Sequence, residues 1–264
     1  MPSEQASAGL AAGMLWPQWD VAPRVAAVMS TRAGGVSAAP WDSLNLGTAV
    51  GDDPAAVAEN RRRFVAMCGA APAWLRQVHG STVVAAHEVI GAAEHPQADA
   101  SWTDRPGVAC VVQVADGMPV LLAAPGGRAV AAAHAGWRGL ASGVVEAALV
   151  MLCGAAGCAP AQVSVWLGPC IGPRRFEVGT DVLQAFGASP ETADKDRFAP
   201  ATASVGSPRW LAHLQLLARD RLQQAGVRRI GGLPWCTVEQ PSRFFSYRRD
   251  GRSGRLAAAV WIRP

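Results

Sequence analysis

The sequence predicts an α+β fold: a single compact domain of mixed β-sheets layered with flanking helices. Short apolar runs of strand type alternate with amphipathic helical segments, but hairpin-like segments interrupt the alternation. This pattern argues against a doubly wound nucleotide-binding fold, and neither a GxGxxG motif nor a P-loop is present. No linker-like stretch divides the 264 residues. We therefore expect one domain over residues 1–264, with residues 1–12 as a loose N-terminal segment.

The expected elements of the N-terminal third are one strand, one helix and one hairpin. The apolar run at 21–30 reads as a strand. A helix is expected over 53–68, because Asp53 before Pro54 has the pattern of a helix cap followed by proline at the first helical position. The segment LRQVHGSTVVAAHEV (75–89) reads as a strand, a turn and a strand around Gly80.

The middle of the chain carries the strongest strand signal. Three apolar runs, at 107–114, 118–124 and 128–134, are short enough for buried strands. After Gly139 the apolar residues recur with a helical period, and this helix is expected to end at Gly154. A strand therefore gives way to a helix within a few residues.

The C-terminal part repeats this alternation and closes with a hairpin. A strand is expected over 163–168 and helices over about 178–187 and 209–225. The segment FFSYRRDGRSGRLAAAVWI reads as a β-hairpin that turns at Asp250-Gly251.

Composition narrows the function classes. Half of the residues are apolar and 17% are charged, as in folded globular proteins. The net charge of +4 comes from dispersed arginines, and Lys195 is the single lysine. Dispersed charge favours a small anionic ligand and argues against nucleic acid as a partner. Residues 1–12 lack the basic start and the apolar run that are typical of a secretory signal, and no apolar run is long enough for a membrane span. We therefore expect a cytoplasmic monomer without disulfides and without a membrane partner.

A histidine ends the third central strand, where the sequence reads RAVAAAHAGWRGL (128–140). His134 lies at the strand-to-helix junction, where α/β architectures collect ligands. Gly136 and Gly139 let a ligand or a neighbouring backbone come close, and Arg138 can hold a carboxylate or phosphate at two points. The alternative is that His134 is a hydrogen-bonded core residue and that Trp137 only packs.

The chain resembles the YfiH/laccase-domain family in blocks that occur in the family's order. They include QVHG (77–80), EHPQADA (94–100), ADGMPVLL (115–122), HAGWRG (134–139), LGPCIGPRRFEVG (167–179) and CT…FFSYRRDGRSGR (236–255). The resemblance covers residues 25–262. It implies a purine nucleoside phosphorylase with adenosine deaminase activity, formerly named polyphenol oxidase, and one bacterial branch is described as a peptidoglycan editing factor.

The resemblance also implies a metal site with a missing ligand. The family places the histidine of QVHG, a cysteine and the histidine of HAGWRG around one zinc, with copper as another possible metal. By position, the metal ligands here are His79 and His134, and the cysteine position is Gly117. Catalytic zinc usually has three protein ligands and one open position.

Three other side chains are candidates for the third position. Cys110 is about 20 Å away along an extended strand, and the side chain of Asp116 points to the opposite face unless a turn brings it round. Cys170 follows another strand end, and its distance from the histidines does not follow from the sequence. The third ligand is thus left open.

The leading hypothesis is a metal-dependent phosphorylase acting on adenosine, inosine or methylthioadenosine, with phosphate as second substrate and deamination by zinc-activated water as a side activity. The expected catalytic residues are His79, His134 and Arg138. The expected substrate-binding residues are Arg32, Arg61, Gln77, Asp99, Cys170 and Arg248. Each arginine has an alternative interpretation as a loop-bracing ion pair.

Two other functions stay open. One is a catalytically impaired homologue that binds a nucleoside or a nucleotide-sugar, and Gly117 is its motivation. The other is an amidase that edits peptidoglycan precursors, which is weakened if that hydrolysis uses the missing cysteine as nucleophile. A multicopper centre is excluded, because five histidines without the motif cysteine cannot supply it. His213 is expected to be structural or solvent-facing.

Overall fold

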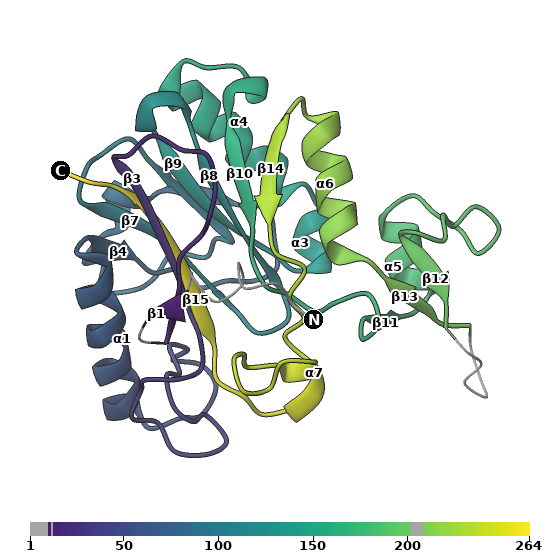
Figure 1. Cartoon of the computed structure of the whole chain (residues 1–264), viewed down its shortest axis with the longest axis horizontal. Helices are drawn as coiled ribbons and strands as arrows, with labels where there is room; N and C mark the ends of the chain where they lie inside the picture. The colour runs from purple at the N-terminus through teal and green to yellow at the C-terminus, as the bar shows by residue number, and fades with distance from the viewer. Residues whose placement is uncertain (1–9, 12, 202–207) are drawn as a thin grey trace.

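Two six-stranded sheets lie face to face in the computed structural model, which describes residues 10, 11, 13–201 and 208–264 (Figure 1). The first sheet consists, in order, of β1 (Leu10–Ala11), β2 (Met14–Leu15), β3 (Val25–Ser30), β15 (Leu256–Ile262), β7 (Val108–Val114) and β4 (Ala71–Ala73). The second consists of β14 (Arg229–Gly232), β10 (Ser164–Leu167), β8 (Met118–Ala123), β9 (Val130–Ala135), β6 (Ala100–Thr103) and β5 (Val83–Ala85).

Helices cover the outer faces of both sheets and make four layers. Helix α1 (Pro54–Cys68) lies on the first sheet, and α4 (Val144–Ala156) and α6 (Leu214–Gln224) lie on the second (Figure 1). Each central strand therefore has both faces buried. In β7, Val112 packs between the sheets, whereas Val111 packs on the side of α1. This double burial explains why the central strands read as continuous apolar runs.

A third, small sheet projects beyond the second sheet (Figure 1). It consists of β11 (Glu177–Val178), β13 (Trp210–Ala212) and β12 (Phe198–Pro200), with α5 (Thr180–Ala185) beside it. The remaining elements are α2 (Ala86–Val89), α3 (Trp137–Ala141), α7 (Tyr247–Asp250) and the 3₁₀ turns η2 (Pro125–Gly127) and η3 (Pro160–Gln162). The predicted α+β class is confirmed.

Local signals placed several elements correctly. The carboxylate of Asp53 accepts a hydrogen bond from the backbone N–H of Ala55, Pro54 opens α1, and Gly69 ends it at φ 64°. The central apolar runs form β7, β8, β9 and β10. In the predicted strand 21–30, only Val25–Ser30 is extended.

Two predictions in the first half of the chain are partly wrong. Within 75–89 only Val83–Ala85 is a strand, and α2 follows it directly. The helix expected from Gly139 to Gly154 is two helices, because Gly143 adopts φ 90° and separates α3 from α4. Helix α4 continues past Gly154 and is capped by Gly157 at φ 58°.

The predicted C-terminal hairpin is wrong. Ser246 accepts a hydrogen bond through its side chain from the backbone N–H of Arg249, and this cap starts the short helix α7. Strand β15 pairs with β3 and β7 instead of the segment before it. The helix expected over 209–225 begins at Leu214, after strand β13, and the one expected over 178–187 is α5.

The segment 1–12, expected to be loose, contains β1 at Leu10–Ala11, and its other residues lie outside the described ones. Among the described residues, no helix is both long enough and apolar enough to cross a bilayer.

Candidate functional site

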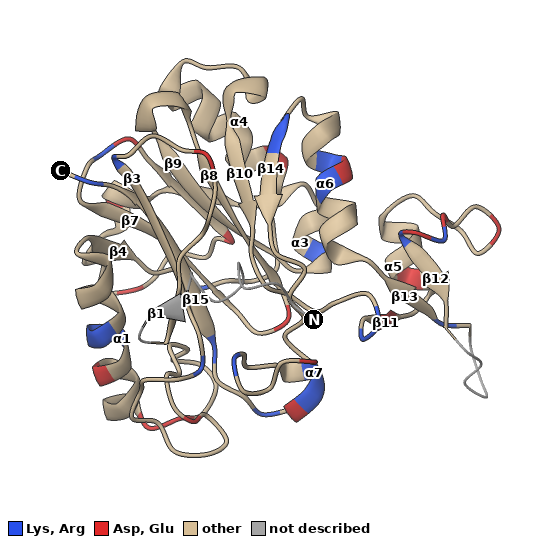
Figure 2. Cartoon of the chain, viewed as in Figure 1, with Lys and Arg blue, Asp and Glu red and all other residues tan. Residues whose placement is uncertain are grey.

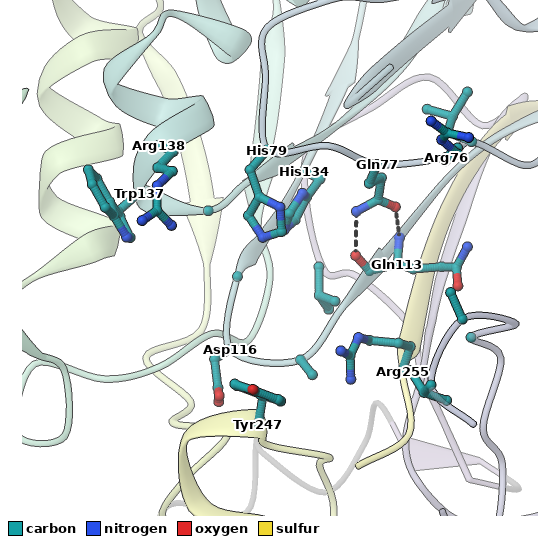
Figure 3. A pocket seen from close by; sticks show the side chains of 18 of the residues that line it. Arg76, Gln77, His79, Gln113, Asp116, His134, Trp137, Arg138, Tyr247 and Arg255 are labelled. Carbon is teal, nitrogen blue, oxygen red and sulfur yellow. Dashed lines mark hydrogen bonds between the residues drawn. The ribbon is translucent and has the colours of Figure 1, made fainter. Parts of the chain in front are cut away.

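A cavity of about 900 Å³ opens at one end of the two sheets (Figure 3). Its walls come from distant parts of the chain: the turn between β7 and β8, the end of β9, helices α3 and α7, and the loop that precedes β5. Both QVHG and HAGWRG contribute a histidine, and Figure 3 shows the rings of His79 and His134 side by side. The cavity therefore joins sequence blocks that are far apart in the chain.

A buried carboxylate orients His134. Its Nδ1 atom lies 2.9 Å from Oδ1 of Asp99, and both side chains are almost completely buried. An ionised carboxylate only accepts hydrogen bonds, so in the neutral form of the His134 ring the proton is on Nδ1 and the lone pair is on Nε2. Nε2 faces the cavity beside Gly117.

The same carboxylate holds the loop that carries His79. Its two oxygens accept hydrogen bonds from the backbone N–H groups of Val78, His79 and Gly80, at 3.0, 2.9 and 2.8 Å. Burial alone would raise the pKa of Asp99, but the hydrogen bonds from His134 and from the backbone lower it. These N–H groups have no strand partner, which explains why this segment is a loop and not the expected strand.

His79 stands edge-on to His134, with ring centroids 4.9 Å apart and an interplanar angle of 79°. Its backbone has φ 61°, an uncommon conformation for a residue with a side chain. Burial, and then the neighbouring His134, lower the pKa of His79. The imidazole is therefore neutral at pH 7 and can exchange hydrogen bonds with a ligand.

The two glycines of HAGWRG allow the histidines to approach. A Cβ atom on Gly136 would lie 3.1 Å from Cδ2 of His79, and one on Gly139 would lie 2.9 Å from the carbonyl oxygen of Gly80. The close neighbours expected at these glycines are thus the His79 ring and the backbone that follows it.

The metal-ligand set is incomplete. Strand register pairs Pro119 with His134, which brings Gly117 beside the ring. A Cβ atom on Gly117 would lie 2.5 Å from Nε2 of His134. In the described part of the chain, no group of three or more His, Cys, Asp or Glu side chains could hold a metal ion. Two imidazoles alone do not fit a catalytic zinc site of the usual kind.

None of the three alternatives completes the set. Asp116 lies in a turn at φ 83°, but its carboxylate accepts hydrogen bonds from Thr237 and from the backbone N–H of Arg248. Cys110 is buried between the two sheets. Cys170 is buried beside Cys236, does not line the cavity, and has a pKa raised by burial.

Two of the four arginines predicted to act in the site line the cavity. Arg138 follows Trp137 at the start of α3, and its guanidinium lies 4.4 Å from the indole centroid. Among the described residues it makes neither a hydrogen bond nor an ion pair through this group. Arg248 also lines the cavity and donates to the carbonyl oxygens of Arg175 and Glu177.

The other two arginines brace loops outside the cavity lining. Arg32 pairs with Asp42 and lies over the ring of Phe245. Arg61 donates to the carbonyl oxygen of Leu46 and stacks on Trp74 at 4.0 Å. Burial lowers the pKa of Arg61 to about 10.

Gln77 lines the cavity, but both polar atoms of its side chain pair with the backbone of Gln113, at 2.7 Å each (Figure 3). In this position the Gln77 amide stabilises the cavity wall. Sequence reasoning missed Arg255, Tyr247 and Phe176, which also line the cavity. Arg255 and Tyr247 lie within the block FFSYRRDGRSGR. Tyr247 is the one tyrosine of the chain, and this feature of the sequence could have indicated it.

Comparison with known proteins identifies the class of protein. Residues 26–263 match the model of the family described as multi-copper polyphenol oxidoreductase laccase, and the chain belongs to this family. It is 48% identical over 248 residues to a protein of Pseudomonas aeruginosa and 45% identical over 251 residues to one of Escherichia coli K12, both named purine nucleoside phosphorylase. Each comparison covers 94% of this chain and 98% of the relative.

Solved structures have the same fold. A Neisseria meningitidis protein, 42% identical, superposes with a TM-score of 0.87 over 96% of this chain and all of its own. YlmD from Geobacillus stearothermophilus, 30% identical, gives 0.86 over 97% of this chain and 98% of its own. The resemblance to the YfiH/laccase-domain family is thereby confirmed.

Proposed function

We propose that this chain is a purine nucleoside phosphorylase whose nucleoside and phosphate meet in the cavity at His79 and His134. The observation that carries the proposal is the adjacent pair of imidazoles in a cavity that Arg138 also lines and that is large enough for both substrates. The names of the relatives that are 43–48% identical over nearly the whole chain support it.

Phosphorolysis makes demands that these residues meet. The glycosidic C–N bond breaks with its electron pair going to the purine, while a phosphate oxygen bonds to the sugar carbon. An anion must therefore be held next to a sugar that becomes cationic. Arginine binds phosphate through two parallel hydrogen bonds, which suits Arg138 and Arg248, both of which line the cavity. Trp137 adds apolar surface to the cavity lining, which a purine ring can contact.

The assay uses purified protein with adenosine, inosine or methylthioadenosine, with and without phosphate. We expect phosphate-dependent release of the free purine and formation of the sugar 1-phosphate. His134→Ala should abolish both, while Arg32→Gln, outside the cavity, should keep them. Free base without phosphate, or no product from any of the three, would contradict the proposal. Inosine formed from adenosine would report the deaminase side activity.

A binding protein without turnover is the second candidate, and Gly117 is the observation that favours it. Zinc or copper dependence follows from the family resemblance, but the ligand set described above does not support it. An editing amidase would have to work without a cysteine at 117. Nucleoside binding without product formation in the same assay would select the second candidate.

A further inference from the structure

We propose that this chain binds its nucleoside directly on the imidazoles of His134 and His79, with no resident transition metal between ligand and protein. The identity of the ligand rests on the proposed function, whereas the statement about the metal stands on the site itself. Three independent features of the cavity lead to it: the number of donors, the space beside His134 and the charge on the walls.

The carboxylates near His134 that could act as metal ligands already accept hydrogen bonds from other groups. Asp99 binds Nδ1, the nitrogen that faces away from the cavity, and its oxygens also accept three backbone N–H groups. Asp116 is held by Thr237 and by the backbone of Arg248. A cation at the two rings would thus have two neutral protein ligands, one fewer than catalytic zinc sites usually have.

The His134 ring occupies the space that a third ligand at position 117 would need. A Cβ atom at Gly117 would lie 2.5 Å from Nε2 and 3.0 Å from Cδ2. A side chain at 117 therefore needs the ring to shift slightly while its other nitrogen stays hydrogen-bonded to the buried Asp99. The glycine at 117 and the position of the His134 ring therefore depend on each other, because Nε2 lies next to the point where the Cβ atom of a ligand side chain would be.

The charges on the walls favour an anion over a dication. Four arginines line the cavity against two carboxylates. The arginines are Arg76, Arg138, Arg248 and Arg255, and the acids are Glu94 and Asp116. Like charges in a partly desolvated site repel one another more strongly than in water. This surplus of positive charge suits phosphate and disfavours a dication held by two uncharged rings.

A metal-free site leaves the lone pair of His134 Nε2 available to the ligand. Nε2 can accept a hydrogen bond from a nucleoside donor, such as a ribose hydroxyl or the exocyclic amine of adenine. The tautomer that allows this is set by Asp99. His134 then contacts the substrate itself, and Asp99 is a positioning residue.

The first test measures metal binding without any substrate. Chelator-stripped protein is titrated with zinc against a chromophoric competitor, for the natural chain and for Gly117→Cys and Gly117→Ala. We expect no stoichiometric zinc site in the natural chain and none in Gly117→Ala. Gly117→Cys should bind one zinc per chain, with an affinity higher than that of the natural chain by on the order of 100-fold, as ligand-shell changes produce. The alanine variant separates the thiolate from the added bulk, and circular dichroism verifies folding.

A stoichiometric zinc in the natural chain that is lost in His79→Ala and His134→Ala would overturn the proposal. If Gly117→Cys folds but does not gain zinc, Gly117 is not the reason why the natural chain lacks a zinc site. If that variant does not fold, the titration of the natural chain still decides the question.

The second test measures inosine and adenosine binding by calorimetry in excess chelator and in added zinc. We expect the same Kd in both conditions and a loss of at least tenfold in His134→Ala. Binding that needs added zinc would overturn the proposal. Binding without phosphorolysis would refute the proposed activity but not the direct contact. If no nucleoside binds in either condition, the proposed function fails and the direct contact with it, while the zinc titration still decides the metal question.

Discussion

His134 Nδ1 and Asp99 Oδ1 lie 2.9 Å apart, and the same carboxylate accepts hydrogen bonds from the loop that carries His79. One buried carboxylate thereby positions both histidines, one through its ring and the other through its backbone. Most of what we expect of the site can be traced to this pair.

Asp99→Asn should impair both stability and activity. An amide cannot accept all four hydrogen bonds that the carboxylate accepts, because its NH₂ group is only a donor. We expect the free energy of unfolding to fall by about 1–3 kcal/mol and kcat/KM by at least about tenfold. Thermal unfolding and product assays measure the two effects. Asp181→Asn, at an exposed carboxylate on α5, is the control. Unchanged kcat/KM in Asp99→Asn would contradict a positioning role.

Gly139→Ala should destabilise the protein, because the new methyl group would lie 2.9 Å from the carbonyl oxygen of Gly80. Overpacking of this kind costs about 1–3 kcal/mol. The matched control is Gly154→Ala in α4, where a Cβ atom meets nothing within 4 Å, and alanine should stabilise the helix by about 0.5–1 kcal/mol. Chemical denaturation of both variants provides the comparison. Equal effects of the same sign would show that the contact with Gly80 is unimportant.

Arg138→Gln should weaken phosphate use without weakening the fold. Loss of a charged hydrogen-bond donor costs about 1.5–3 kcal/mol, so KM for phosphate should rise roughly ten- to hundredfold. Arg32→Gln should behave in the opposite way, because Arg32 pairs with Asp42 and lies over Phe245. Here the melting temperature should fall while KM stays within about twofold. Steady-state kinetics and thermal unfolding of both variants decide whether the two arginines differ in this way.

His213 should make stability depend on pH. Its Nδ1 atom accepts a hydrogen bond from the backbone N–H of Leu216 and caps α6. Burial lowers its pKa in the folded protein, so the unfolded chain binds the proton more tightly. The contribution of His213 is therefore complete above the ordinary histidine pKa of about 6.5 and is lost as pH falls through that value toward the folded one.

His213→Asn tests this pH dependence, since asparagine caps helices well and does not titrate. We expect the melting temperature of the variant to fall less between pH 7 and pH 5 than that of the natural chain. Identical slopes would mean that other groups, such as His79 or His95, carry the pH dependence.

The parts of the fold that local signals determine were predictable. The Asp53-Pro54 cap and the buried runs of β7 to β10 act over a few residues, and the structure has them where the sequence places them. The C-terminal hairpin was not predictable in this way. An Asp-Gly pair favours a turn, but the side-chain cap by Ser246 starts a helix first, and β15 finds its partners far away in the chain.

The same distinction between local signals and long-range contacts applies to the candidate site. The end of a predicted strand indicated His134, the family resemblance indicated His79, and the structure brings their rings together. Sequence could not show that Arg61 stacks on Trp74 outside the cavity lining, or that Gln77 uses its amide on Gln113. It also could not show Arg255 in the wall, because contacts between distant segments decide which arginine faces the cavity and which braces a loop.

The most direct measurement is a crystal structure of the protein grown with inosine and phosphate. We expect the nucleoside in the cavity beside Trp137, within hydrogen-bond distance of His134 Nε2, with phosphate on Arg138. A nucleoside bound elsewhere on the molecule, or one whose nearest contact at the histidines is a metal ion, would contradict a site built directly on the two imidazoles.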